Sequence, residues 1–90
     1  MLFTRTFIVK GRVQGVNYRA SAKQEAEALQ VKGTAKNLAN GNVEIIATAT
    51  KEKLDAFEAW CWKGPAFSTV TQVEATETPL REFTDFRIIR

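Results

Sequence analysis

The 90-residue chain contains no histidine and a single cysteine, Cys61, and these two facts set the first limits on its chemistry. Without histidine, a Ser-His-Asp or Cys-His catalytic mechanism is excluded, and so is a zinc site built from cysteine and histidine. One cysteine cannot form an internal disulfide, which is typical of a reducing compartment or of a cysteine that packs as a small apolar side chain. Any chemistry must therefore rely on carboxylates, cations, amides, backbone donors or water.

Long apolar segments are also missing from the sequence. No stretch reaches the ~18 apolar residues that a membrane-spanning helix needs, and charge interrupts the N-terminal segment too early for a signal peptide. We therefore expect a cytoplasmic protein without a membrane partner. Ninety residues leave room for one hydrophobic core, which predicts a single domain over residues 1–90. Nothing in the sequence indicates an obligate partner, so a monomer is expected.

Charge is distributed unevenly along the chain. Residues 1–40 contain seven Lys or Arg and two acidic residues, whereas residues 41–90 contain six and eight, so the two parts carry net charges of +5 and −2. A basic half favours an anionic partner, either a small anion or a polyanion. On charge alone, a solvated lysine-rich surface is the simpler interpretation.

The pattern of apolar residues predicts five strands and two helices. Alternating apolar residues predict the strands, and segments rich in Ala, Glu, Gln and Lys with an apolar stripe predict the helices. The order β-α-β-β-α-β, followed by a short last strand, is that of a ferredoxin-like α+β sandwich in which both helices cover one face of an antiparallel sheet. The predicted strands are residues 4–10, 32–38, 43–49, 70–78 and 85–89, and the predicted helices are residues 18–29 and 51–62.

Three side chains of the second predicted helix need an interpretation of their own. Cys61 falls on the apolar stripe of this helix, and its neighbours offer no group that would stabilise a thiolate, so we expect it in the core and not as a nucleophile. Trp60 and Trp62 lie two positions apart and therefore do not face each other. We expect Trp60 to be partly buried and Trp62 to lie at the surface.

The segment of residues 11–19, Gly-Arg-Val-Gln-Gly-Val-Asn-Tyr-Arg, joins the first predicted strand directly to the first predicted helix. A turn bounded by Gly11 and Gly15 can aim several backbone N–H groups at one point, and the helix start adds unpaired N–H groups and the positive end of its dipole. Arg19 lies in the first helical turn, where its guanidinium can hold two phosphate oxygens. These features favour a phosphate site, although a plain strand–helix turn with a surface arginine would have the same glycine pattern.

Asn37 ends the second predicted strand, just before the hairpin turn that Asn40-Gly41 predicts. Its side-chain amide can both donate and accept hydrogen bonds, so it can orient a water molecule beside a bound phosphate. The commoner use of an asparagine near a turn is to cap its own backbone.

These two segments resemble the signatures of the acylphosphatase family. Residues 11–19 match the whole first signature, G-R-V-Q-G-V-x-[FY]-R, and residues 33–43 resemble the second, glycine-aromatic-x-x-N-x-x-x-G-x-V. Residues 63–65 and 85–88 are similar to the family as well, so the resemblance spans the chain in order. Two positions depart from the pattern. Thr34 replaces an aromatic residue, and Ala49 replaces a glycine, which would cost about 1 kcal/mol if that position needs a positive φ angle.

The resemblance implies an enzyme that hydrolyses acyl phosphates to a carboxylate and inorganic phosphate, with no cofactor, no metal and no covalent intermediate. It implies that the Arg19 side chain binds the phosphate with two hydrogen bonds and that the Asn37 amide positions the attacking water. Inorganic phosphate would then be both product and competitive inhibitor. The backbone N–H groups implied to hold the phosphate are those of Gln14, Gly15, Val16, Asn17, Tyr18 and Arg19.

This chemistry suits a chain without histidine. A carboxylate is a good leaving group, so the protein has to hold the phosphoryl group, stabilise its oxygens and align the water. A non-catalytic module that binds an anion through the same loop is the alternative. A nucleic-acid binder of the same strand order is disfavoured because no aromatic RNP pattern lies on a central strand, so we expect no nucleic-acid partner.

Overall fold

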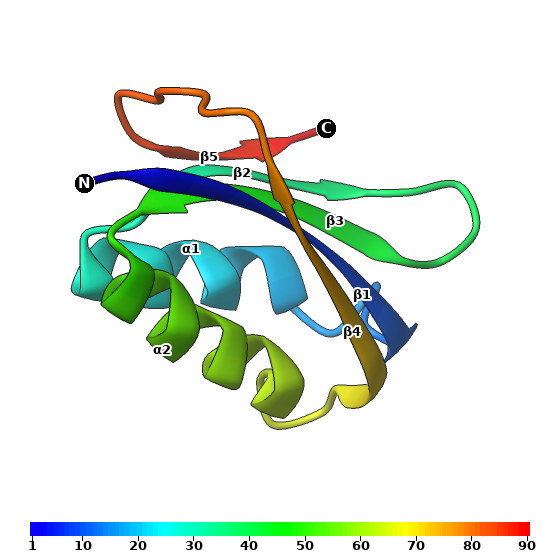
Figure 1. Cartoon of the computed structure of the whole chain (residues 1–90). Coiled ribbons are helices and arrows are strands. Elements are labelled where there is room, and N and C mark those ends of the chain that lie inside the picture. Colours follow the sequence, from blue (N-terminus) through cyan, green and yellow to red (C-terminus); the bar gives the residue numbers. More distant parts are fainter.

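In the computed structural model, which describes residues 1–90, two helices cover one face of a five-stranded sheet (Figure 1). Every predicted element is present, and the ends differ from the prediction by two residues at most. No helix is long and apolar enough to span a membrane. The strands are β1 (Phe3–Arg12), β2 (Lys32–Asn37), β3 (Val43–Ala49), β4 (Thr69–Thr78) and β5 (Phe86–Ile89), and the helices are α1 (Tyr18–Leu29) and α2 (Lys51–Lys63).

The core lies between the sheet and the helices. The apolar residues that alternate along β1 and β3 point toward the helices and are buried, as their spacing predicts. Phe57 of α2 meets Phe7 and Phe86 edge to face, with ring centroids 6.1 and 6.0 Å away. Trp60 is half-buried and Trp62 is exposed, both as predicted. The buried apolar residues of β1, α1, β3 and α2 are Phe7, Val9, Tyr18, Ala22, Ala26, Val43, Ile45, Ala47, Ala49, Leu54, Phe57 and Cys61.

The last strand corrects one part of the prediction. The strand order is β4-β1-β3-β2-β5, and the first four of these strands pair antiparallel, but β5 runs parallel to β2. The reason is the route of the chain: β4 and β5 lie at opposite edges, so residues 79–85 cross the sheet before β5 begins (Figure 1). The sheet is therefore mixed and not antiparallel throughout. Local alternation cannot reveal this, because strand direction depends on the connection.

Two buried threonines hold this crossing segment in place. Thr4 and Thr48 lie opposite each other on β1 and β3, and their Oγ1 atoms are 2.6 Å apart. The backbone of Arg81 connects to both, since its N–H donates to Thr4 Oγ1 over 2.8 Å and its carbonyl oxygen accepts a hydrogen bond from Thr48 Oγ1. Residues 79–85 are thereby fixed on the side of the sheet away from the helices, and this position determines where β5 starts.

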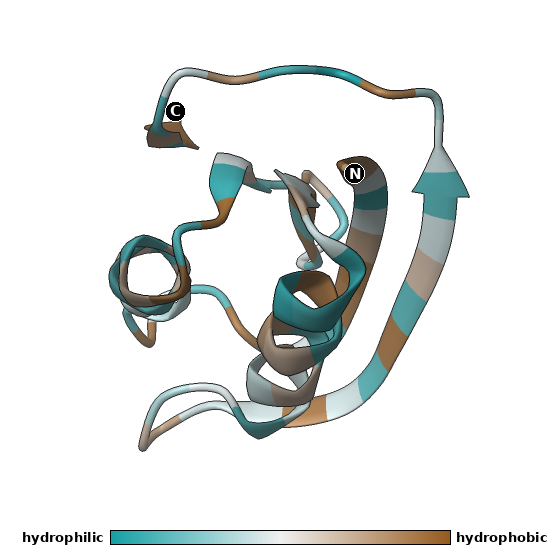
Figure 2. Ribbon diagram, turned by 60° about the vertical axis from the view of Figure 1, so that its left-hand side comes forward, coloured by the Kyte–Doolittle hydropathy of each residue, from teal (hydrophilic) through white to brown (hydrophobic).

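β4 forms the other edge of the sheet, and it is mostly exposed. Its hydropathy changes from residue to residue, as the bands along the strand in Figure 2 show, and Val73 is its one buried side chain. β4 pairs with β1 along almost its whole length, with a bulge between Lys10 and Gly11. A Cβ atom at Gly11 would overlap the carbonyl oxygen of Thr69, so glycine is needed there. The bulge lies near the end of β1, just before the loop that leads into α1.

Candidate active site

The loop between β1 and α1 turns the chain through two left-handed residues, Gly15 (φ 73°) and Asn17 (φ 66°). Asparagine is among the residues that tolerate this conformation best, and Asn17 also stands at the N-cap of α1. The backbone N–H groups of residues 13–17 donate to no backbone acceptor. The loop therefore presents unpaired donors at the positive end of the α1 dipole, which is the arrangement that the sequence predicts for an anion site.

A cleft of about 250 Å³ lies between this loop and the C-terminal ends of β2 and β5. Two arginine side chains and no acidic side chain are among its lining residues, so the cleft favours an anion. Arg19 and Asn37, which are far apart in the sequence, both line it. The full set of lining residues is Val13, Gly15, Asn17, Tyr18, Arg19, Ala20, Asn37, Ile88 and Arg90.

Arg19 is held in this cleft by the last strand. Its Nη1 atom donates a hydrogen bond to the carbonyl oxygen of Ile89 over 3.1 Å, and the side chain takes part in no ion pair. A guanidinium has five N–H donors in a planar fork. The bond to Ile89 therefore restrains the orientation of the group and leaves donors for two oxygens of a ligand.

The Asn37 side chain has an unusual hydrogen-bonding state. Its Oδ1 atom is buried and has no hydrogen-bond partner in the protein. Buried polar atoms are almost always paired, because removing them from water without a partner is costly. The capping role that asparagine often has near a turn belongs to Asn40, whose Oδ1 accepts from the N–H of Asn42 over 3.1 Å. Asn37 thus lines the cleft with its side-chain acceptor unpaired, and it is not a cap.

Three of the predicted loop residues use their side chains elsewhere. Val16 packs against the core, and Gln14 Nε2 donates to the carbonyl oxygens of Leu38 and Asn42 on the β2–β3 hairpin. Neither Gln14 nor Val16 lines the cleft, whereas the other four predicted residues do. The sequence assigned all six a role through their backbone N–H groups, and that assignment stays a prediction. Tyr18 is the third loop residue whose side chain is used elsewhere, and this side chain is buried.

Tyr18 connects the loop to α2. Its hydroxyl donates to the carbonyl oxygen of Cys61 over 2.7 Å, and its ring packs on Trp60. Burial raises the pKa of Tyr18 far above its ordinary value, so the phenol is neutral and carries no proton in a reaction near pH 7. Burial likewise raises the pKa of the Cys61 thiol to about 12, against a smaller opposing effect of the hydrogen bond with Tyr18. The expectation that Cys61 is a core residue is confirmed.

Sequence reasoning assigned no role to four residues of the cleft. Val13 and Ala20 flank the predicted loop residues in the chain. Ile88 and Arg90 enter the cleft because β5 lies beside β2, and the local pattern of β5 gave no sign of that neighbour. The two departures from the family pattern lie outside the cleft. The φ angle of Ala49 is not positive, so alanine does not carry the cost of about 1 kcal/mol expected at a position that needs a left-handed glycine. Thr34 is half-buried in β2, opposite Ile46.

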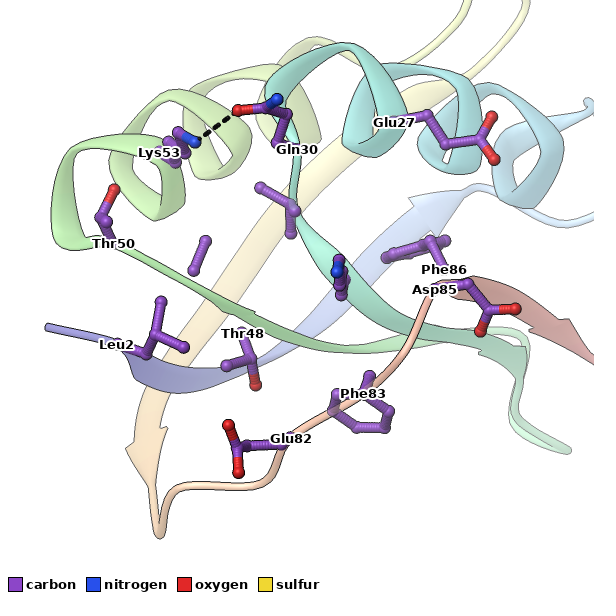
Figure 3. Close-up of a pocket in the computed structure, with 13 residues that line it drawn as sticks. Leu2, Glu27, Gln30, Thr48, Thr50, Lys53, Glu82, Phe83, Asp85 and Phe86 are labelled. Carbon is purple, nitrogen blue, oxygen red and sulfur yellow. Dashed lines mark hydrogen bonds between the residues drawn. The ribbon is translucent and has the colours of Figure 1, made fainter.

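A second, larger cavity of about 610 Å³ lies at the opposite end of the sheet (Figure 3). It is bounded by the end of α1, the start of α2 and the crossing segment of residues 79–85, and it contains none of the predicted site residues. Its charges are mixed: Lys32 and Lys53 share it with three acidic side chains. Lys53 Nζ donates to Gln30 Oε1 over 2.8 Å, as Figure 3 shows. The groups suited to phosphate therefore converge in the smaller cleft.

Comparison with known proteins agrees with this geometry. The family model for acylphosphatase matches residues 5–88. The chain is 48% identical to an acylphosphatase of Xanthomonas euvesicatoria pv. vesicatoria, over 89% of this chain and 91% of the relative. It is 44% identical to one of Methylococcus capsulatus, over 92% and 91%. The crystal structure of acylphosphatase from Bacillus subtilis is similar over 100% of both chains, with a TM-score of 0.95 and 36% identity. The chain therefore belongs to the acylphosphatase family of acyl phosphate hydrolases.

Proposed function

We propose that the cleft between the β1–α1 loop, β2 and β5 is the active site for acyl phosphate hydrolysis, with Arg19 holding the phosphate and Asn37 orienting the water. The observation that carries this proposal is that one cleft combines the Arg19 guanidinium, the unpaired Asn37 Oδ1 and a row of free backbone N–H groups, without any acidic side chain. A cation and free donors bind a phosphate, and a free acceptor next to them suits a water molecule.

Phosphate binding falls to the loop and Arg19. The backbone N–H groups of residues 14–19 surround the equatorial oxygens of the phosphoryl group, and the helix dipole adds to their positive potential. The Arg19 donors that do not contact Ile89 bind two of these oxygens. Because β5 and the loop already fix these donors, little reorganisation is needed when charge increases on the oxygens in the transition state.

The water attacks phosphorus from the side of Asn37. Asn37 Oδ1 accepts one hydrogen bond from this water, so that an oxygen lone pair faces phosphorus in line with the bond that breaks. The phosphorus–oxygen bond to the acyl group then cleaves, and its electron pair leaves with the carboxylate. The water proton passes to a phosphate oxygen. No side-chain base is required, in agreement with a cleft that contains neither histidine nor an acidic side chain.

The same features support several wider proposals. Arg19 and the loop supply the positive charge that a metal ion would otherwise bring, and the lining residues include no acidic or histidine side chain, so we propose a metal-independent reaction. The 17 buried apolar residues form one cluster, which supports a single domain over residues 1–90. We propose that this domain acts as a monomer. We propose that it acts in the cytoplasm.

The test is the hydrolysis of benzoyl phosphate in the presence of a metal chelator. We expect steady turnover to benzoate and inorganic phosphate, with competitive inhibition by added phosphate. A chain that binds phosphate but does not hydrolyse benzoyl phosphate would instead be the non-catalytic anion-binding module. Turnover that stops on adding the chelator and returns with a divalent metal would contradict the metal-independent mechanism.

A further inference from the structure

The Gln14 side chain joins the β1–α1 loop to the β2–β3 hairpin. Its Nε2 atom lies 2.7 Å from the carbonyl oxygen of Leu38 and 2.9 Å from that of Asn42, and it donates a hydrogen bond to each. These two bonds use both N–H groups of the amide. Gln14 is half-buried, so water competes only partly for the two carbonyl groups. The loop that holds the phosphate and the hairpin are thus linked directly, across more than 20 residues of sequence.

The two carbonyl groups lie next to the Asn37–Val43 pair, one step toward the turn of the hairpin. Leu38 follows Asn37 directly, and Asn42 precedes Val43, which is the partner of Asn37 in the β2–β3 ladder. Asn42 O also accepts from Leu38 N over 2.8 Å within the hairpin. A carbonyl oxygen has two lone pairs and can accept both bonds. The hairpin therefore closes without Gln14. The Gln14 side chain restrains the position of the hairpin relative to the loop.

We propose that Gln14 is a positioning residue that sets the separation between the phosphate loop and the Asn37 amide. This inference rests on the proposed function, in which the loop binds the phosphate and Asn37 orients the water. The Gln14 side chain does not line the cleft, so it acts through the hairpin backbone next to Asn37. Because a misplacement of about 1 Å between reacting groups can cost on the order of 10²-fold in rate, losing this link lowers kcat while leaving the phosphate site in place.

The kinetic test compares Gln14→Met with Gln24→Met. Methionine has nearly the length of glutamine but no N–H donor, and Gln24 is an exposed residue of α1 that does not line the cleft. We expect Gln14→Met to lower kcat for benzoyl phosphate about 10- to 100-fold while changing the inhibition constant of inorganic phosphate less than about threefold. Gln24→Met should change neither. An unchanged kcat, or an inhibition constant that rises by the same factor as kcat falls, would overturn the inference.

Gln14→Glu gives a second test with a different readout. A carboxylate of the same shape cannot donate to the Leu38 and Asn42 carbonyl groups, but the protonated acid can donate to one of them. We therefore expect kcat of Gln14→Glu, relative to the parent chain, to rise as the pH falls, whereas the ratio for Gln14→Met stays constant. A Gln14→Glu variant that matches the parent at every pH would contradict the role of these donors.

A titration with inorganic phosphate, followed by NMR, separates this inference from the proposed function. In the parent chain, phosphate should shift the backbone N–H signals of the loop and also the side-chain NH₂ signals of Asn37. In Gln14→Met the loop signals should respond with similar affinity, and the Asn37 signals should respond less. If the parent shows this pattern without hydrolysing benzoyl phosphate, the proposed reaction fails and the link stands. If Asn37 responds equally in both proteins, the link fails.

Discussion

Arg19 Nη1 donates a hydrogen bond to the carbonyl oxygen of Ile89, 70 residues further along the chain and 3.1 Å away. The first turn of α1 and the end of β5 are thereby joined at the wall of the cleft. An unrestrained arginine side chain loses considerable rotamer entropy when it binds a ligand. Here the bond to Ile89 already restrains the side chain, so part of this entropy is lost before phosphate binds.

Replacement of Arg19 should affect both binding and turnover. We expect Arg19→Ala to lower kcat/KM for benzoyl phosphate by on the order of 10³-fold or more, and to weaken competitive inhibition by inorganic phosphate, because the side-chain clamp is lost. Arg19→Lys should restore only a small part of the lost kcat/KM, because an ammonium group cannot contact Ile89 and two phosphate oxygens in one plane. Arg81→Ala, which removes a guanidinium that contacts Phe83 on the crossing segment, is the matched control. Full activity of Arg19→Ala would exclude the assigned role.

Replacement of Asn37 should separate turnover from binding. We expect Asn37→Ala to reduce kcat by on the order of 10²-fold or more, because the water loses its orientation. The inhibition constant of inorganic phosphate should stay within about threefold of the parent value, since the loop and Arg19 are intact. The measurement is a steady-state series with phosphate as inhibitor. Equal losses of binding and turnover would show that Asn37 contacts the phosphate itself, contrary to the division of roles.

Replacement of Thr48 should affect stability without affecting the chemistry. Thr48→Val keeps the shape of the side chain but removes the hydroxyl that bonds to Thr4 and to the Arg81 carbonyl. We expect the free energy of unfolding in urea to fall by about 1–2 kcal/mol, because buried partners lose a hydrogen bond. Thr76→Val, at an exposed position of β4, should change it much less. A large fall in kcat for Thr48→Val under folding conditions would mean that the crossing segment influences the cleft.

Tyr18, the single tyrosine of the chain, should make the folded protein less stable at alkaline pH. In the unfolded chain its phenol ionises near pH 10, whereas burial keeps the folded pKa far above that value. The contribution to stability is therefore complete below about pH 10 and decreases as the pH rises above it. Urea denaturation at several pH values should show this decrease, and the tyrosinate absorbance band should appear only with unfolding. Tyrosinate that forms in the folded protein near pH 10 would contradict the burial argument.

The variant Tyr18→Phe is the control for this prediction. It keeps the ring contact with Trp60, and it removes both the ionisation and the hydrogen bond to Cys61 O. We expect the alkaline dependence to become weaker and not to vanish, because the Cys61 thiol, with a pKa of about 12, acts in the same direction. An alkaline dependence identical to that of the parent chain would assign the whole effect to other groups.

The sequence predicts well those features that depend on neighbouring residues. Alternating apolar residues predicted the first strand, in which Phe7 and Val9 share the buried face, and Gly15 and Asn17 are residue types that tolerate the left-handed conformation they adopt. Both signals are local, since side-chain alternation and backbone sterics act over a few residues. The loop, Arg19 and Asn37 could be assigned to one function because a family signature covers them.

Features that depend on distant contacts were not predicted. The parallel pairing of β5 with β2 brings Ile88 and Arg90 into the cleft and the Ile89 carbonyl to Arg19, and no pattern within β5 indicates that neighbour. Gln14 shows the same limit, because its sequence context fits a backbone role while its side chain reaches a hairpin more than 20 residues away. Which side chains meet across a fold depends on chain path and rotamer, and local periodicity contains neither.

The threonine pair under the crossing segment has a consequence for the order of folding. Thr4 and Thr48 can meet only after β1 and β3 have paired, and residues 79–85 can dock only onto that pair. Long-range and parallel contacts form late because their loop-closure entropy is high. The strand that brings the Ile89 carbonyl to Arg19 should then be the last to arrive. Recovery of hydrolysis during refolding should accordingly lag behind the burial of Trp60. The return of enzymatic activity would then report the last step of folding, in which β5 pairs with β2.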